Sequence, residues 1–268
     1  MFYHCAGIMA KRKAQKKSNL WIHAIIIFFL VLCAYITSMY LWQRYEDSKA
    51  KFILYPGFGI ELPVAFTIHG IDVSTYQQIV YWPAVKQMQV SDVSINFVFI
   101  KATEGLVNTD KQFKRNWQKA KDAGIPRGAY HYFLSTKDGK VQANNFIKQV
   151  HLESGDLPPV LDVEQLYNTP VSLMQQRVKT WLQTVETAYH VKPIIYSSAD
   201  FYNRYLGKDF DSYPLWVAHY FAQQKPRVQR DWQFWQHSSL GHINGIVTNV
   251  DFNVFNGDTT AFKAMLVK

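Results

Sequence analysis

The sequence predicts an α/β protein: an irregular, TIM-like (β/α) barrel of about eight strands with reduced helices, preceded by one N-terminal transmembrane helix. Three observations lead to this prediction. Strand-like and helix-like segments alternate from residue 66 onward, which favours a parallel sheet with both faces covered. Eight of the segments are strand-like, enough to close a barrel. Residues 20–42 contain no charged side chain, and this length suffices for a helix that spans a bilayer.

The uncharged stretch 20–42 is predicted to remain in the mature protein as a transmembrane helix. Trp21, Tyr40 and Trp42 lie near its ends, and aromatic residues there are typical of membrane–water interfaces. A cleaved signal peptide is the alternative, but no A-x-A cleavage pattern follows the apolar run. Residues 1–19 carry five basic side chains and no acidic one. The positive-inside rule therefore predicts a cytoplasmic basic tail, with the rest of the chain outside the cytoplasm.

Between the helix and the barrel, residues 43–65 are predicted to form a juxtamembrane linker. The segment is first polar (QRYEDSKAK) and then apolar, with two prolines and two glycines. This composition suggests a stalk that packs partly on the barrel. Residues 66–268 form the predicted barrel domain. The chain is 48% hydrophobic and 16% aromatic, so it can bury a core.

The charge of the chain is concentrated in the basic tail. Of the 29 basic side chains, five lie in the tail, and the remaining 24 face 20 acidic ones. This mild positive balance does not indicate a nucleic-acid partner. Both cysteines, Cys5 and Cys33, precede the linker, so neither a disulfide nor thiol chemistry is expected in the barrel.

The predicted strands are short and rich in β-branched and aromatic residues. They occupy residues 66–73, 96–102, 128–133, 158–164, 193–196, 215–218, 232–236 and 249–252. Helical periodicity predicts a short helix from about Pro83 and longer helices over residues 110–123, 138–150 and 170–189. In the longest helix, Val178, Trp181 and Val185 share one face, which predicts burial in the core. About 200 residues is small for a complete (β/α)₈ barrel, so some outer helices should be missing or reduced.

Four acidic residues lie at or near the ends of predicted strands: Asp72, Asp162, Glu164 and Asp251. Asp162 and Glu164 are two residues apart in one strand, so they share a face at a spacing of roughly 6.6 Å. Converging carboxylates are costly unless something at that place needs them. Because function in parallel α/β folds lies at the carboxyl ends of the strands, we expect the four acids to gather in one site.

Glycoside hydrolysis is a chemistry that needs gathered carboxylates. One carboxylic acid protonates the leaving oxygen, and negative charge stabilises an oxocarbenium-like centre. Crowding raises the pKa of at least one carboxyl and keeps it protonated near neutral pH. Aromatic side chains offer platforms for sugar rings, and four are predicted near the rim: Tyr130, Tyr132, Trp216 and Trp235. Burial in the core is the alternative for the two tryptophans.

Two other kinds of site are compatible with the same residues. Four acids without a nearby cysteine suit Mg²⁺ or Ca²⁺, and His69 or His131 could add nitrogen ligands. A non-catalytic module could instead bind a cell-wall glycan in the same groove, as a lectin does. Loss of one of the acids would favour the binding module, but all four are present.

Eight stretches of the chain resemble, in order, those of the glycoside hydrolase family 25 lysozymes, the N-acetylmuramidases. They are GIDVS (70–74), FVFIKATEG (97–105), GAYHYF (128–133), PPVLDVE (158–164), PIIY (193–196), LWVAHY (215–220), WQHSS (235–239) and VDFNVFNG (250–257). Each stretch is modest alone, and their common order makes the resemblance specific. The family has an irregular barrel with eight strands and few helices, which agrees with the eight strands predicted from the residues.

The resemblance implies cleavage of the β-1,4 bond between N-acetylmuramic acid and N-acetylglucosamine in peptidoglycan, with no metal and no other cofactor. By motif match, Glu164 is the general acid/base. Asp162 would assist the substrate's 2-acetamido group as that group attacks the anomeric carbon, which gives retention. Asp72 and Asp251 are the flanking acids. The spacing of the carboxyls alone leaves retaining and inverting hydrolysis open.

The resemblance also implies a cleft that binds the glycan strands. Its matching residues are Tyr130, Tyr132, Lys101, Trp216 and Trp235. A salt bridge to a neighbouring acid is the alternative for Lys101, and Glu104 is expected to be structural.

The N-terminal helix is a departure from the many relatives that are secreted and carry wall-binding repeats. It predicts a single-pass protein of the bacterial inner membrane with a cytoplasmic N-terminus and a periplasmic catalytic domain. The enzyme would then be tethered and would act on the wall of its own cell. The alternative function is a non-catalytic, membrane-tethered peptidoglycan-binding module.

Overall fold

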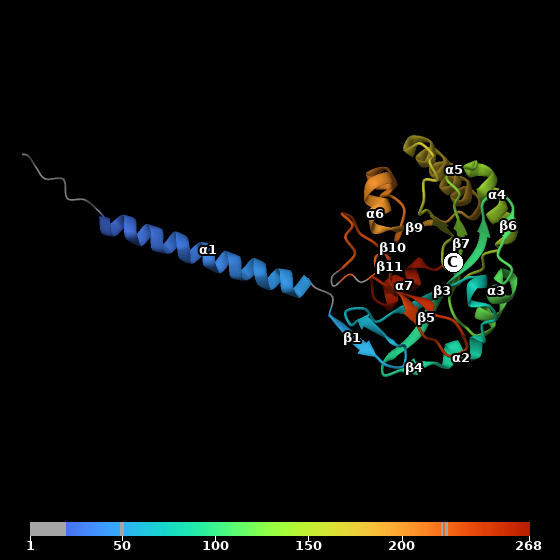
Figure 1. The fold of residues 1–268 in the computed structure, drawn as a ribbon, viewed down its shortest axis with the longest axis horizontal. Coiled ribbons are helices and arrows are strands. Elements are labelled where there is room, and N and C mark those ends of the chain that lie inside the picture. The colour runs from blue at the N-terminus through green and yellow to red at the C-terminus, as the bar shows by residue number, and fades with distance from the viewer. Residues whose placement is uncertain (1–19, 49–50, 221, 223–224) are drawn as a thin grey trace, which may run out of the picture. The chain divides into compact units, whose positions relative to one another are not determined.

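The computed structural model describes residues 20–48, 51–220, 222 and 225–268. The chain divides into two compact units, Met1–Ser48 and Lys49–Lys268. In the first unit, helix α1 (Leu20–Ser48) contains a stretch, Trp21–Tyr45, that is long and apolar enough to cross a membrane, with a hydropathy of 2.4 (Figure 1). The predicted helix 20–42 therefore continues into the polar residues beyond it. The predicted basic tail lies outside the described residues.

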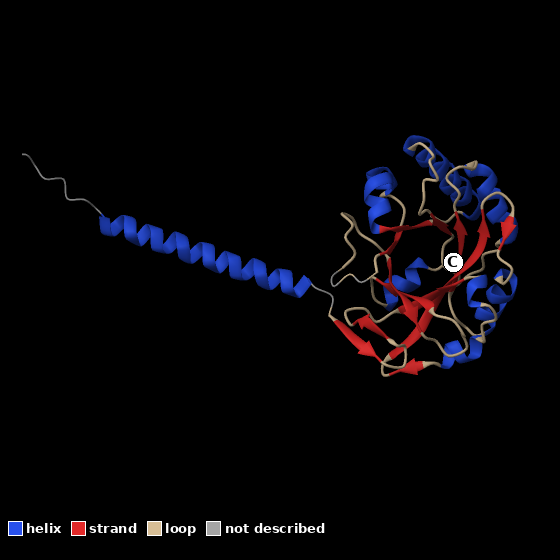
Figure 2. Ribbon diagram, in the orientation of Figure 1, coloured by secondary structure: helices blue, strands red, loops and turns tan. Residues whose placement is uncertain are grey.

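In the described part of the second unit, eight strands close into a barrel (Figure 2). They are β3 (His69–Val73), β5 (Val93–Glu104), β7 (Arg127–Tyr132), β8 (Val160–Asp162), β9 (Ile194–Ser198), β10 (Leu215–Ala218), β11 (Phe234–Gly241) and β12 (Val250–Phe255). Their order around the sheet is β3-β12-β11-β10-β9-β8-β7-β5, and pairing of β3 with β5 completes the ring. The predicted barrel of about eight strands is confirmed.

The last strand of the barrel runs against the others. Strand β12 is antiparallel to both of its neighbours, β11 and β3, whereas the remaining neighbouring pairs of the ring are parallel. The connection from Gly241 to Val250 is short and contains no helix. A parallel return needs a crossover of a dozen or more residues, so this connection permits only the antiparallel direction.

Helices cover the first half of the barrel and are reduced in the second half, as predicted. The long ones are α3 (Phe113–Asp122), α4 (Gly139–Gln149) and α5 (Val171–Tyr189), and α2 (Trp82–Gln87) begins with Pro83 in its first turn. On α5, the side chains of Val178, Trp181 and Val185 are fully buried, which confirms the core face expected from their spacing. The shorter elements are η1 (Thr75–Gln77), β4 (Gln89–Val90), β6 (Asn108–Thr109), α6 (Ala199–Phe201), η2 (Tyr202–Leu206), η3 (Gly207–Phe210) and α7 (Thr259–Met265).

The second half of the predicted linker is part of the barrel unit. Strands β1 (Phe52–Tyr55) and β2 (Ile60–Pro63) form an antiparallel hairpin. Phe58 and Leu62 are buried, and the ring of Phe58 lies 5.2 Å from that of Phe252 on β12. The compact unit therefore begins at Lys49, ahead of the predicted barrel boundary at residue 66, because the apolar part of the predicted linker packs on the barrel.

Alternation along the strands divides the core into an inner and an outer part. On β5, Phe97 and Phe99 belong to a cluster inside the barrel, and Val98 and Ile100 belong to the larger cluster beneath the helices. The inner cluster is aromatic, with Phe99 stacked on Trp216 at 4.3 Å between ring centroids. A Cβ atom at Gly70 would lie 2.4 Å from the Phe97 ring, so the tight interior requires glycine there. The barrel is therefore a packed core and not an open pore.

Candidate active site

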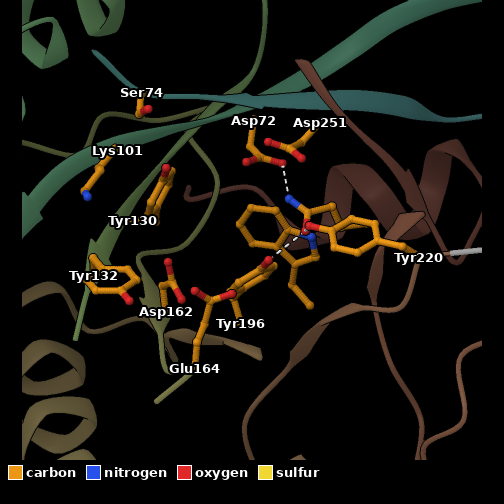
Figure 3. A pocket seen from close by; sticks show the side chains of 12 residues that line it. Asp72, Ser74, Lys101, Tyr130, Tyr132, Asp162, Glu164, Tyr196, Tyr220 and Asp251 are labelled. Atoms are coloured by element: carbon orange, nitrogen blue, oxygen red, sulfur yellow. Dashed lines mark hydrogen bonds between the residues drawn. The ribbon is translucent and has the colours of Figure 1, made fainter. Parts of the chain in front are cut away.

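A cavity of about 260 Å³ lies at the carboxyl ends of the parallel strands (Figure 3). Its walls are polar, and carboxylates and tyrosines predominate. The lining residues are Asp72, Ser74, Lys101, Tyr130, Tyr132, Asp162, Glu164, Tyr196, Trp216, Tyr220, Gln236 and Asp251. All four acids predicted to share one site are among them. The cavity is therefore the candidate active site.

The Asp-x-Glu pair reaches the cavity because alternation continues beyond the end of β8. Asp162 is the last residue of the strand, and Glu164 lies two residues farther on. The backbone stays extended there, since Val163 N–H donates to the Tyr196 carbonyl at 2.9 Å. Val163 itself is buried in the outer core. The two carboxylates therefore face the same space, as the i, i+2 spacing predicts.

Asp251 reaches the same cavity from β12, the strand that runs antiparallel to the others. It lies near the start of β12 and pairs directly with Asp72 of β3 in the antiparallel register. Because β12 runs antiparallel, the beginning of this strand lies at the edge where the parallel strands end. The fourth acid is thus placed by the reversed last strand and not by a parallel strand end.

Two amide groups fix the orientation of Asp72. Asn253 Nδ2 and Gln236 Nε2 both donate to Asp72 Oδ2, at 2.8 and 2.7 Å. The Asn253 oxygen accepts from Trp216 Nε1 at 2.7 Å. Trp216, at the floor of the cavity, therefore orients Asn253, and Asn253 in turn orients Asp72.

Burial raises the pKa of all four carboxyls. For Asp72 the pKa rises to about 6, because burial outweighs the hydrogen bonds from Asn253 and Gln236. For Asp251 the pKa rises to about 8, through burial and then the charges of Asp72 and Glu164. Near neutral pH this facing pair therefore holds about one proton between its two carboxyls.

The Asp-x-Glu pair is perturbed in the same direction. Burial raises the pKa of Asp162 well above its ordinary range, Glu164 adds to the rise, and Lys101 opposes it. Burial also raises the pKa of Glu164, whereas a hydrogen bond with the Tyr196 hydroxyl and the charge of Lys101 lower it. The buried oxygen Asp162 Oδ1 has no hydrogen-bond partner among the described residues. An unpaired buried acceptor is costly, and a ligand donor in the cavity would satisfy it.

Lys101 combines the two roles considered for it. Its ammonium group forms an ion pair with Glu104 at 2.7 Å. It also lines the cavity and lies 4.9 Å from the centroid of the Tyr132 ring. The Tyr132 hydroxyl in turn lies 2.9 Å from that of Tyr167. Glu104 does not line the cavity, and it holds Lys101 there.

Trp235 is a correction to the predicted site. Its side chain is fully buried, donates from Nε1 to the His219 carbonyl at 3.0 Å and packs against the Trp232 ring. It does not line the cavity, because the residue of β11 that faces inward is its neighbour, Gln236. Trp216, by contrast, lines the floor of the cavity.

Sequence reasoning missed Ser74, Tyr196, Tyr220 and Gln236. The signal was available for all four, because each belongs to a stretch that resembles the lysozyme family: GIDVS, PIIY, LWVAHY or WQHSS. Strand parity places Trp235 and Gln236 on opposite faces of β11, but it does not decide which of the two faces the cavity. Tyr220 follows β10 in a loop, where parity gives no guidance.

The histidines considered as metal ligands lie elsewhere. His131 is buried, with Nδ1 2.7 Å from Thr103 Oγ1 and Nε2 3.3 Å from Gln142 Oε1. Neither His69 nor His131 lines the cavity. Within the described ranges, no group of three or more His, Cys, Asp or Glu side chains is arranged to hold a metal ion.

A closed α/β barrel with a polar, carboxylate-lined cavity at its carboxyl edge meets the requirements of glycoside hydrolysis. Sequence comparison is specific about the family: the profile of glycosyl hydrolases family 25 matches residues 71–246. The chain belongs to this family, and its relatives make it a hydrolase of the lysozyme, or muramidase, type.

Individual relatives support the same assignment. The chain is 41% identical over 239 residues to the uncharacterised protein YegX of Escherichia coli K12, covering 89% of this chain and 85% of that one. It is 33% identical over 213 residues to Lysozyme M1 of Streptomyces globisporus, covering 74% and 71%. The solved structure of a family 25 glycosyl hydrolase from Bacillus anthracis matches with a TM-score of 0.70 and 30% identity, over 76% of this chain and 95% of that one.

Proposed function

We propose that the protein cleaves the β-1,4 bond between N-acetylmuramic acid and N-acetylglucosamine in peptidoglycan, with retention assisted by the substrate. The observation that carries this proposal is the pair of Asp162 and Glu164, which face one cavity together with two further acids. Peptidoglycan hydrolysis is the activity common to the lysozyme relatives. The bond, the mechanism and the residue roles are the proposed part.

Glu164 is the proposed general acid and base. Burial raises its pKa above that of an ordinary glutamate and so favours the protonated acid. This proton passes to the leaving glycosidic oxygen as the bond to the anomeric carbon breaks. The resulting carboxylate then takes a proton from the water that attacks the same carbon. Glu164 thereby returns to its starting state at the end of each cycle.

Asp162 is the proposed partner of the substrate's 2-acetamido group. Its unpaired Oδ1 can accept the acetamido N–H, which turns the carbonyl oxygen of that group toward the anomeric carbon. Attack by this oxygen forms a cyclic oxazolinium and displaces the leaving group. The developing positive charge favours the ionised form of Asp162, so the carboxyl releases its proton to solvent water and its carboxylate stabilises the oxazolinium.

Asp72 and Asp251 are the proposed flanking acids. The two amides that donate to Asp72 favour its ionised form, while burial favours the protonated form of Asp251. The pair therefore contributes about one negative charge beside the reacting sugar. Lys101, Tyr130 and Tyr132 are the proposed contacts for the glycan, with Trp216 beneath them.

The apolar helix α1 is the proposed membrane anchor. Its stretch Trp21–Tyr45 has the length and hydropathy of a span, and five basic residues precede it in the sequence. We infer a single-pass topology in a bacterial inner membrane with the barrel in the periplasm. Protease added to the outer face of that membrane should digest or release the barrel. A barrel protected until the cytoplasmic face is opened, or a mature chain that begins near residue 40, would contradict the anchor.

The decisive experiment is digestion of purified peptidoglycan by the full chain in detergent, with mass spectrometry of the new reducing ends. Reducing-end muramic acid supports the proposal, and reducing-end glucosamine would indicate a glucosaminidase. Glu164→Gln should fold and lose nearly all activity, because an amide neither gives nor takes the proton. Glu61→Gln, a change of the same kind at an exposed residue of β2 outside the cavity, is the matched control and should retain activity. Binding without any products from the unaltered protein would favour a non-catalytic module.

A further inference from the structure

Tyr167 lies at the rim of the cavity, just outside its lining. Its hydroxyl is 2.9 Å from the hydroxyl of Tyr132, and Tyr132 lines the cavity. Tyr167 itself is exposed, with 41% of its surface accessible. It belongs to the loop that follows β8, shortly after Glu164 in the sequence. The aromatic wall of the cavity therefore continues past Tyr132 onto the exposed rim.

The backbone at Tyr167 adopts a conformation that tyrosine disfavours. Residues 166–169 form a tight turn, in which Thr169 N–H donates to the Leu166 carbonyl at 2.9 Å. The two central residues, Tyr167 and Asn168, have φ of 48° and 61°. Such left-handed values suit asparagine or glycine, whereas a bulky side chain there is strained. Local backbone preference therefore does not account for a tyrosine in this turn.

Contacts on both sides hold the turn in place. Before it, the Gln165 carbonyl accepts a hydrogen bond from the buried Ser135 hydroxyl, and Arg177 Nη1 donates to the Ser135 carbonyl at 2.6 Å. After it, Thr169 is buried and leads into α5. Backbone strain persists only where the surrounding structure fixes it, and it is concentrated at functional sites. The turn thus holds an exposed aromatic ring in a fixed place.

The cavity is too small to enclose more than a short part of a glycan strand. Its volume of about 260 Å³ lies below the ~300–1,000 Å³ that is usual for sites of drug-sized ligands. A strand with its glycosidic bond at Glu164 must therefore continue over the rim. Figure 3 shows Lys101 and Tyr132 on one side of Glu164, with Asp251 on the other. Tyr167 adjoins the first of these sides.

We propose that Tyr167 is a substrate-binding residue: its exposed ring is a platform for a sugar ring of the glycan strand outside the cavity, on the side of Lys101 and Tyr132. Tyrosine suits this task, because its apolar face can stack on a sugar while its hydroxyl stays hydrogen-bonded. The sugar on Tyr167 lies beyond the two that the cleaved bond joins. Tyr167 therefore adds affinity for long strands and none for a single disaccharide. The inference deepens the proposed hydrolysis and rests on it.

The test measures binding to the full chain with Glu164→Gln, in detergent and by titration calorimetry, so that the ligands stay intact. The ligands are the β-1,4-linked disaccharide of N-acetylmuramic acid and N-acetylglucosamine, and an octasaccharide of the same alternating strand. The octasaccharide should bind more tightly. Adding Tyr167→Asn should weaken its binding about five- to tenfold and leave disaccharide binding unchanged. Equal weakening for both ligands, or for neither, would overturn the proposal.

Two properties of the Tyr167 variants separate the ring from a structural role. Asparagine tolerates the left-handed backbone, so Tyr167→Asn should not lower the denaturant midpoint of unfolding. A clearly lower midpoint would show that Tyr167 stabilises the fold and would count against the proposal. Tyr167→Phe keeps the ring and loses only the contact with the Tyr132 hydroxyl, so it should keep the larger part of the octasaccharide affinity. A loss as large as in Tyr167→Asn would assign the effect to the hydroxyl and overturn the platform.

His190→Asn is the matched control. His190 is also exposed and has a left-handed backbone, with φ of 56°, but it caps the C-terminus of α5 and does not line the cavity. Its replacement relieves the same kind of strain and should leave octasaccharide binding unchanged, so weaker binding would show a nonspecific effect and count against the proposal. An unaltered protein that binds the octasaccharide without cleaving it would count against the proposed hydrolysis. Undiminished octasaccharide binding in Tyr167→Asn would count against this inference alone.

Discussion

Asp251 should lower the stability of the barrel above neutral pH, and Asp251→Asn should remove this cost. Burial raises the pKa of Asp251 from 3.8 to about 8. Below pH 4 the folded and unfolded chains both hold the proton, so the shift contributes little. As pH rises, the unfolded chain releases the proton first, while the folded barrel keeps it up to about pH 8. The free energy of unfolding therefore falls over this range and levels off above it.

The size of the effect follows from the shift. One pKa unit corresponds to about 1.4 kcal/mol, so the whole shift sets an upper limit of ~6 kcal/mol. Asp251 is partly exposed and titrates together with Asp72, and relaxation around a buried charge reduces the cost further, so we expect ~2–4 kcal/mol. Asparagine has nearly the same shape and no charge. Asp251→Asn should exceed the stability of the unaltered protein by only ~1 kcal/mol near pH 4.5 and by ~2–4 kcal/mol near pH 9, while losing activity because a flanking acid is gone.

Denaturant unfolding of the full chain in detergent, followed by circular dichroism at about pH 4.5, 7 and 9, measures this difference. Asp231→Asn is the matched control, because Asp231 is exposed and its charge should make no pH-dependent difference. A stability difference between Asp251→Asn and the unaltered protein that stays constant with pH would refute the reasoning. So would a variant that is less stable than the unaltered protein at the highest pH.

Two further outcomes are expected from the proposed mechanism and the core. Asp162→Asn should have severely impaired activity, because the oxazolinium cation loses a stabilising charge. Peptidoglycan whose muramic acid lacks the N-acetyl group should be a poor substrate. Full turnover of that peptidoglycan, or a glycosyl ester on Asp162, would contradict substrate assistance. Trp181→Ala should cost about 3–5 kcal/mol of stability, typical of a buried large-to-small change, since Trp181 is fully buried against Phe146 and His131; unchanged unfolding together with lost glycan binding would contradict its place in the core.

Local pattern was sufficient for much of the fold and for the acids. The spacing of Asp162 and Glu164 predicted their common direction, because alternation is a property of extended backbone that holds even after β8 ends. The helical face of Trp181 was predicted for a similar reason. Both inferences need only the repeat of side-chain directions along a single strand or helix and the side of that element on which the core lies.

What the sequence did not reveal depends on relations between elements. Trp235 is predicted in the cleft because aromatic residues suggest sugar platforms, whereas the choice between Trp235 and its neighbour Gln236 depends on which face of β11 turns inward. The direction of β12 is set by a short connection whose ends must meet in space. The hairpin around Phe58 was read as a linker because its prolines and glycines outweighed the alternation of Phe58, Ile60 and Leu62.

The pairing of β12 with β3 determines when the active site can exist. The barrel closes between a strand near the start of the domain and the strand that is synthesised last, and Asp72 meets Asp251 across that closure. A nascent chain that has grown only to Phe252 has all four acids but only the first residues of β12, and it lacks Asn253, which holds Asp72. Contacts so distant in sequence form late in folding. Assembly of the site is therefore tied to the synthesis of β12, and we expect fragments that end before Asn253 to lack hydrolytic activity.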